Sequence, residues 1–181
     1  EFQDYFSMMS RAQALMDMER WSEAVAIHNK GLGAHPDNHW ILCSLALSHL
    51  NMGDRNQAMD YANRAVSVAP EEEWGHRLRG VILLQQKKAV ESFQAAREAV
   101  RIAPEWPMAL YVLVQALTEN KQLGEARVTA EKLRQIAPEA EISHEALGNV
   151  ALEQRRWNAA EEHFEAALRV NPNSYEAMNN L

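Results

Sequence analysis

The stretch LGNVALEQRRWNAAEEHFEAALRVNP, residues 147–172, decides the fold of this 181-residue chain. It ends on a proline, and four earlier prolines precede that one at equal steps along the chain. Such regular spacing of five among six prolines does not arise by chance, and it is typical of a repeat architecture. The five prolines are Pro36, Pro70, Pro104, Pro138 and Pro172.

Numbering from Tyr5 divides the chain into repeats of 34 residues, which is the spacing of the prolines. Residues 1–4 are then an N-terminal extension or cloning residues, and we expect residues 5–181 to form a single domain. The predicted repeats are 5–38, 39–72, 73–106, 107–140 and 141–174, followed by a partial sixth at 175–181.

Further places of the repeat agree with this register. The twentieth place is small in every repeat, which lets two helices approach each other closely, and the thirtieth is an apolar anchor before each proline. The residues at the twentieth place are Ala24, Ala58, Ser92, Ala126 and Ala160.

Each repeat contains two helical patterns of apolar residues, separated by turn signals such as NMGDR at 51–55. Helix-forming residues are abundant and β-branched residues are sparse, which indicates an all-α fold. Each proline ends a second helix because it lacks an N–H group and disfavours helix in the preceding residue. The predicted helices are 5–18, 21–34, 39–52, 55–68, 73–85, 89–102, 107–119, 123–136, 141–153, 156–169 and 173 onward.

The pattern resembles the tetratricopeptide repeat, a helix–turn–helix of about 34 residues marked by Leu-Gly, then Ala-x3-Phe, then Pro. The fifth repeat matches best, with Leu147-Gly148, Ala160, Phe164 and Pro172. The third departs most, since Lys87-Lys88 stands where Gly-Asp is usual, and its turn is the least supported by sequence. The resemblance implies an all-α, right-handed superhelical solenoid of five helix–turn–helix repeats plus the first helix of a sixth.

Bulk properties exclude several classes of function. A net charge of −7 argues against nucleic-acid binding, which needs a basic surface to neutralise phosphates. The single cysteine permits no internal disulfide and fits a reducing compartment, so we expect a cytoplasmic protein unless the full-length chain carries a signal or a membrane anchor. The run NHWILCSLALSHL, residues 38–50, lacks charged Lys, Arg, Asp and Glu but is too short to span a membrane, which takes about 20 apolar residues.

The resemblance also implies where a ligand binds. In the family, first helices line a concave groove that holds an extended peptide or a helix of a partner protein, and the second, fifth, ninth and twelfth places of the repeat face it. Arg77 would offer a positive contact to an acidic ligand residue. The candidate groove residues are Phe6, Met9, Trp40, Cys43, Leu47, Leu50, Trp74, Arg77, Val81, Leu84, Met108, Tyr111, Gln115, Ile142 and Asn149.

Two questions about this groove stay open at the level of sequence. Trp40 and Trp74 either face the groove or lean on the preceding repeat as ordinary core. The groove itself either takes a partner or is filled by residues beyond Leu181 or by a second copy of the chain. Tyr175, Met178 and Leu181 form an apolar stripe on an uncompleted repeat, so we expect the natural protein to continue past Leu181.

Other chemistries lack the residues they need. Glu145 reverses the charge that a carboxylate clamp for acidic C-termini requires at the fifth place, and His35 and His39 flank a proline turn without further metal ligands. We therefore expect no catalytic residue, no metal and no cofactor. The predicted function is a non-enzymatic protein-interaction scaffold. The alternatives are a self-associating assembly module, or an adaptor region of a larger enzyme or secretion complex.

Overall fold

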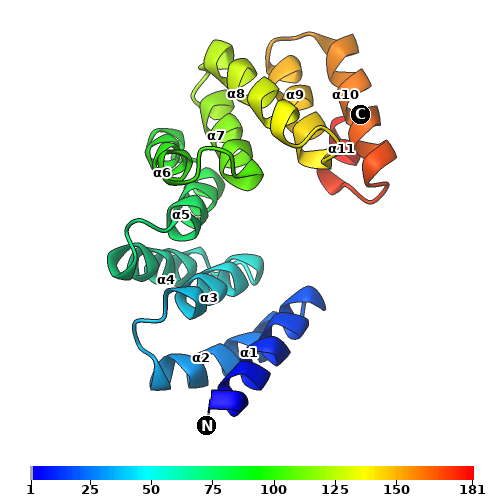
Figure 1. Cartoon of the computed structure of the whole chain (residues 1–181). Coiled ribbons are helices and arrows are strands. Elements are labelled where there is room, and N and C mark those ends of the chain that lie inside the picture. The colour runs from blue at the N-terminus through cyan, green and yellow to red at the C-terminus, as the bar shows by residue number, and fades with distance from the viewer. Residues whose placement is uncertain (1) are drawn as a thin grey trace. The chain divides into compact units, whose positions relative to one another are not determined.

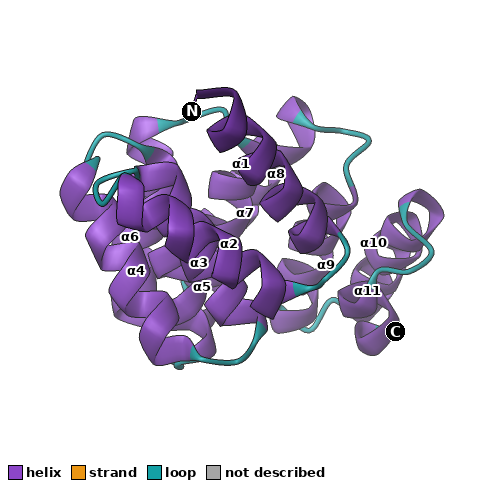
Figure 2. Ribbon diagram, turned by 90° about the horizontal axis from the view of Figure 1, so that it is seen from below, coloured by secondary structure: helices purple, strands orange, loops and turns teal. Residues whose placement is uncertain are grey.

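The computed structural model describes the backbone from Phe2 to Leu181 and the side chains from Tyr5 onward. Over these residues the chain forms eleven α-helices and no strand (Figure 1, Figure 2). The helices are α1 (Phe2–Asp17), α2 (Trp21–Ala34), α3 (His39–Asn51), α4 (Arg55–Val68), α5 (Glu73–Gln85), α6 (Ala89–Ile102), α7 (Pro107–Glu119), α8 (Leu123–Ile136), α9 (Glu141–Glu153), α10 (Trp157–Val170) and α11 (Tyr175–Asn180).

The predicted all-α fold class, with two helices in each of the five repeats, is confirmed. Two boundaries differ by more than one residue. Helix α1 begins at Phe2 rather than at Tyr5. Glu1 and the side chains of residues 2–4 lie outside the described residues. The interpretation of residues 1–4 as an extension or cloning residues therefore stays a prediction. Helix α11 begins at Tyr175 rather than at 173 because the Ser174 side chain accepts a hydrogen bond from the Ala177 N–H and thereby caps the helix.

The turn inside each repeat has one backbone geometry. The fifteenth place of the repeat has a positive φ in all five cases, near +60° at the four non-glycine residues and +84° at Gly53. The third repeat, whose Lys87-Lys88 departs from the family pattern, makes the same turn as the others: Lys87 N–H donates to the Leu84 carbonyl and Lys88 N–H to that of Leu83. The residues at this place are Glu19, Gly53, Lys87, Lys121 and Arg155.

The chain divides into two compact units, an N-terminal unit up to Ile82 and a C-terminal unit from Leu83 to Leu181. The single-domain organisation of residues 5–181 stays a prediction. In the N-terminal unit, α3, α4 and α5 enclose a core built largely from alanine and leucine. The buried core residues there are Leu42, Cys43, Ala46, Leu50, Ala58, Ala62, Ala65, Leu78 and Ile82.

In the C-terminal unit, the core between α9, α10 and α11 contains an aromatic ring, that of Phe164, which is fully buried. Gly148 on α9 makes room for this ring, because a Cβ atom at Gly148 would lie 2.6 Å from Phe164 Cε1. The glycine of the Leu147-Gly148 signature is therefore required by a neighbouring ring. None of the helices in the described residues has the length and apolar character that a membrane crossing requires.

Candidate functional site

The first helices of the repeats, which carry the candidate groove residues, present different side chains in the two units. In the N-terminal unit, Trp40 at the start of α3 is 65% exposed, and Phe6 on α1 is 57% exposed. The Trp40 ring meets the ring of Trp74 on α5 edge to face, with centroids 5.2 Å apart and an interplanar angle of 62°. We call Trp40 and Trp74 the tryptophan pair.

The structure treats the two members of the tryptophan pair differently. Trp74 is half-buried and packs against the core of the N-terminal unit, whereas Trp40 stands on the surface. Of the two, Trp74 contributes to the core, and Trp40 presents an exposed ring, so its place in a ligand groove stays a prediction.

Three candidate groove residues are buried instead of lying on an open face. Cys43 is 0% exposed and Leu50 is 7% exposed, and both belong to the core of the N-terminal unit, which corrects the expectation that they face a groove. They turn inward because α3 is packed on both of its apolar sides, so its fifth and twelfth places are covered. Burial raises the pKa of the Cys43 thiol to about 12, which keeps it neutral and unreactive. The third, Tyr111, is 8% exposed and lies in the C-terminal unit.

The remaining candidates lie partly accessible on the first helices. Met108 is 37% exposed. Arg77 is not a free cation, because its Nε donates to the Glu73 carboxylate at 3.0 Å one turn earlier on α5. The half-buried candidates are Met9, Leu47, Trp74, Arg77, Val81, Leu84, Gln115, Ile142 and Asn149.

In the C-terminal unit, the structure brings Tyr111 and Asn149 together with three residues that the sequence did not predict. The Tyr111 hydroxyl lies 3.0 Å from Glu145 Oε2 and 2.8 Å from Glu176 Oε2. Ser174 donates its hydroxyl to Glu145, and the Asn149 side-chain amide donates to Glu176. We call these five residues the Tyr111 cluster.

The electrostatics of the Tyr111 cluster follow from its burial. Glu145 is only 5% exposed, and burial is the main cause that raises its pKa above the ordinary value. Burial likewise raises the pKa of Tyr111, so its hydroxyl stays protonated. Sequence spacing held one signal for this contact: Tyr111 and Glu145 occupy the same place in consecutive repeats.

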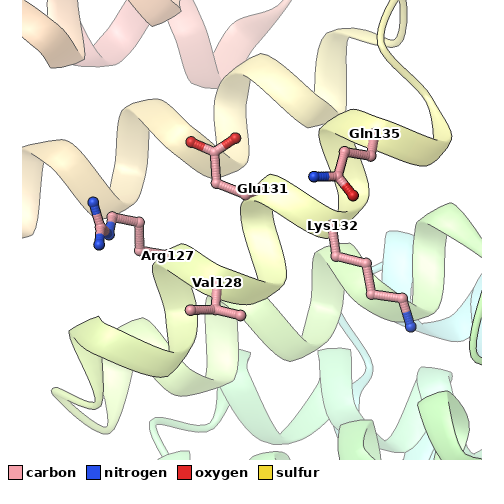
Figure 3. A pocket seen from close by; sticks show the side chains of 5 residues that line it. All are labelled: Arg127, Val128, Glu131, Lys132 and Gln135. Atoms are coloured by element: carbon pink, nitrogen blue, oxygen red, sulfur yellow. The ribbon is translucent and has the colours of Figure 1, made fainter.

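Two surface depressions lie near α8 in the C-terminal unit. One, of about 380 Å³, is lined by residues of α8 alone, and Figure 3 shows Glu131 and Lys132 pointing to opposite sides of that helix. The other, of about 90 Å³, has an apolar floor from α9 and a rim of mixed charge that includes Arg127 and His163. Neither gathers the convergent polar groups of a catalytic site, and within residues 5–181 no group of His, Cys, Asp or Glu has the arrangement of a metal site.

Comparisons with known proteins agree on the fold. A family model described as "Tetratricopeptide repeat" matches residues 43–107 and 145–181, together more than half of the chain. No curated protein sequence matches the chain.

Three solved structures share the fold at low sequence identity. TTC0263, a thermophilic TPR protein of Thermus thermophilus, has 16% identity and a TM-score of 0.84, with 97% of this chain and 95% of that chain covered. PilF of Pseudomonas aeruginosa has 14% identity and a TM-score of 0.81, covering 98% and 81%. MamA from Desulfovibrio magneticus RS-1, residues 41 to the end, has 19% identity and a TM-score of 0.72, covering 94% and 97%.

Proposed function

Because the chain belongs to the tetratricopeptide repeat family, we propose that it is a protein-interaction scaffold, not an enzyme, and that its first helices bind an extended peptide or a helix of a partner protein. The observation that carries this proposal is the exposure of Trp40 beside Trp74 on consecutive first helices of the N-terminal unit.

The energetics of Trp40 favour a covered state. A tryptophan buries roughly 150–250 Å² when fully covered, so the exposed part of this ring corresponds to roughly 100–160 Å². At about 25 cal/mol per Å² its burial would contribute roughly 2.5–4 kcal/mol before ordering costs. Tryptophan is also among the residues that most often dominate binding energy at protein interfaces.

The neighbours of Trp40 fit an apolar anchor in a ligand. Trp74 supports the ring from one side, and the Arg77–Glu73 ion pair on the same helix as Trp74 neutralises the charge that Arg77 would otherwise offer. We therefore infer that an apolar or aromatic ligand side chain, rather than an acidic one, occupies the position beside the tryptophan pair.

Selection of binders from a phage-displayed library of random peptides tests the proposal without knowledge of the natural partner. Peptides enriched on the wild-type chain are synthesised, and their Kd is measured by fluorescence polarisation on wild type and on Trp40→Ala. We expect Trp40→Ala to weaken binding about tenfold or more, as for a central interface tryptophan.

A matched control variant is Trp157→Ala, which removes a tryptophan of similar exposure, 60%, from the start of α10. Its affinity for the selected peptides should equal that of the wild type. Equal losses in the two variants, or no enrichment of peptides by the wild-type chain, would contradict binding at the tryptophan pair.

Self-association is a second candidate, favoured by the exposed apolar stripe at the C-terminal end of the structure. Tyr175 is 77% exposed, Met178 is 51% exposed and Leu181 is 58% exposed. Sedimentation over a range of concentrations would show a dimer that Met178→Glu abolishes. A monomer at all concentrations would leave peptide binding as the function.

A further inference from the structure

Three helices of the C-terminal unit meet at the Tyr111 cluster. Tyr111 comes from α7, Glu145 and Asn149 come from α9, and Glu176 comes from α11, with Ser174 as the cap of that helix. Tyr111, Glu145 and Ser174 are 8%, 5% and 4% exposed, so their hydrogen bonds are largely shielded from water. In such a place each polar atom needs a partner within the protein.

The hydrogen atoms of the cluster do not suffice if both carboxyl groups are ionised. Tyr111 has a single hydroxyl hydrogen, yet its oxygen lies within hydrogen-bond distance of both Glu145 Oε2 and Glu176 Oε2. Ser174 already gives its hydroxyl hydrogen to Glu145 Oε1. One of the two contacts of Tyr111 would therefore bring two oxygen lone pairs together without a hydrogen between them.

Glu145 is the carboxyl group better placed to hold the additional proton. It is the more buried of the two, and the charged groups that act on it are acidic: Glu176 on α11 and Glu141 on its own helix α9. Glu176 instead accepts a charge-stabilising hydrogen bond from the Asn149 amide. Burial raises the pKa of Glu145 and outweighs the hydrogen bonds with Ser174 and Tyr111, which lower it, so the net direction agrees with this assignment.

We propose that Glu145 is protonated in the folded chain and donates to the Tyr111 hydroxyl, which donates to Glu176, so that a single proton fastens α11 to α7 and α9. Loss of this proton as the pH rises leaves two carboxylates against one hydroxyl and releases α11. The helix has six residues, too few to stay folded without such contacts. Its release uncovers Tyr111 and Asn149.

The direction of the pH effect follows from the raised pKa. A carboxyl group whose pKa is higher in the folded state stabilises that state below its unfolded pKa, and this contribution is lost as the pH rises through the folded pKa. The attachment of α11 should therefore be strongest in mild acid and weaken toward alkaline pH. Burial lowers the pKa values of His144 on α9 and His163 on α10, so these residues destabilise the fold as the pH falls, which is the opposite direction. Both histidines are left unchanged in every variant of the test.

The experiment measures two quantities on the same chain. Carbon-detected NMR of labelled glutamate follows the Glu145 carboxyl group between pH 4 and pH 9, and amide exchange gives protection factors for residues 175–181, corrected for the intrinsic pH dependence of exchange. We expect Glu145 to titrate above the usual range of a glutamate, near pH 4.3 in model peptides. Protection of α11 should fall with the same midpoint, by about tenfold for each pH unit above it.

Glu145→Gln tests the assignment because its amide group donates to Tyr111 while its carbonyl accepts from Ser174, as the protonated acid does. This variant should keep α11 protected at alkaline pH and remove the pH dependence. Glu176→Gln is the comparison variant: it removes the second carboxylate, so Tyr111 can donate to Glu145 and the pKa of Glu145 should fall below its wild-type value. The proposal is overturned if Glu145 titrates in the ordinary range, if Glu145→Gln retains the wild-type pH dependence, or if only Glu176→Gln removes it.

Discussion

The two compact units build the same repeat but differ in what their first helices carry and in how their cores are filled. The N-terminal unit exposes the Trp40 ring on a first helix over a core made largely of alanine and leucine. The C-terminal unit buries the Phe164 ring in its core, and its first helices carry a buried network around Tyr111 and Glu145. One repeat pattern therefore carries an exposed aromatic ring on a first helix in one unit and a buried hydrogen-bonded network on first helices in the other.

This difference shows that a place in the repeat does not fix the environment of its side chain. The twenty-fourth place holds Ala62 in the second repeat and Phe164 in the fifth, and both are fully buried. The larger ring is accommodated because the eighth place is Gly148 in the fifth repeat but Ala46 in the second. The larger side chain at the twenty-fourth place of the fifth repeat is therefore offset by a smaller one at its eighth place, and the two helices of that repeat still pack together.

The largest effect should come from removing the ring that distinguishes the C-terminal core. Phe164→Ala leaves a cavity between α9, α10 and α11, and we expect a loss of about 3–5 kcal/mol in the free energy of unfolding. Urea unfolding followed by circular dichroism measures it. A loss below about 1 kcal/mol would contradict the prediction, because it would mean that the Phe164 ring contributes little to the packing of the C-terminal core.

Gly148→Ala should have the next largest effect, because its added methyl group would lie 2.6 Å from the Phe164 ring. Overpacking of this kind costs about 1–3 kcal/mol. The matched control is Gly124→Ala near the start of α8, where an added Cβ meets no atom within 4 Å. In the Phe164→Ala background the cost of Gly148→Ala should disappear. If it persists there, the ring does not dictate the glycine.

A smaller effect separates the turns of the two units. Gly53→Ala in the N-terminal unit forces a side chain onto a φ of +84° and should cost about 1 kcal/mol. Arg155→Gly in the C-terminal unit makes the reverse change at the same place of the repeat, where φ is +59°, and should stabilise by up to about 1 kcal/mol. Equal signs for the two variants in thermal unfolding would show that φ does not govern these turns.

The smallest effect concerns histidine. His144 and His163 in the C-terminal unit have ring centroids 6.5 Å apart, and burial lowers the pKa of each below 6.5. Their contribution to stability is present above pH 6.5 and is lost as the pH falls through the lowered folded-state pKa values. We expect His163→Gln to reduce the loss of stability between pH 7 and pH 5, measured by urea unfolding.

His28 is the matched residue in the N-terminal unit, because burial lowers its pKa too. His28→Gln tests whether a single buried histidine accounts for the acid sensitivity. If His28→Gln abolishes the pH dependence of stability while His163→Gln leaves it unchanged, His144 and His163 do not contribute to the acid sensitivity.

The helices were predictable from sequence because their signals are local and recur at the same places of every repeat. The prolines and the small residues at fixed places fix the register of the whole chain, and even the turn at Lys87 keeps the geometry of the others despite its unusual residue. Regular packing overrides a single departure from the family pattern, since the turn is held by backbone hydrogen bonds that any residue makes.

The site was predictable only in part because exposure depends on neighbours far along the chain. Trp40 and Cys43 lie three residues apart on α3, yet one is on the surface and the other is core. The burial of Glu145 was harder to predict from sequence than that of Cys43. A glutamate is rarely buried without a partner, and the partners of Glu145 come from α7 and from the cap of α11. Sequence spacing relates Tyr111 to Glu145 as equivalent places of consecutive repeats, but it does not show that the cap of α11 joins them.

The recurring positive φ at the fifteenth place has a consequence for how the array comes apart. Four of the five turns carry a residue with a side chain where glycine would relieve strain; all four are exposed, and one of them, Lys121, pairs with Glu153. In a linear array each repeat contacts only its neighbours. The backbone strain of a turn therefore lowers the free energy needed to open its own repeat. We therefore expect substitutions at these five backbone positions to change the order in which the repeats melt.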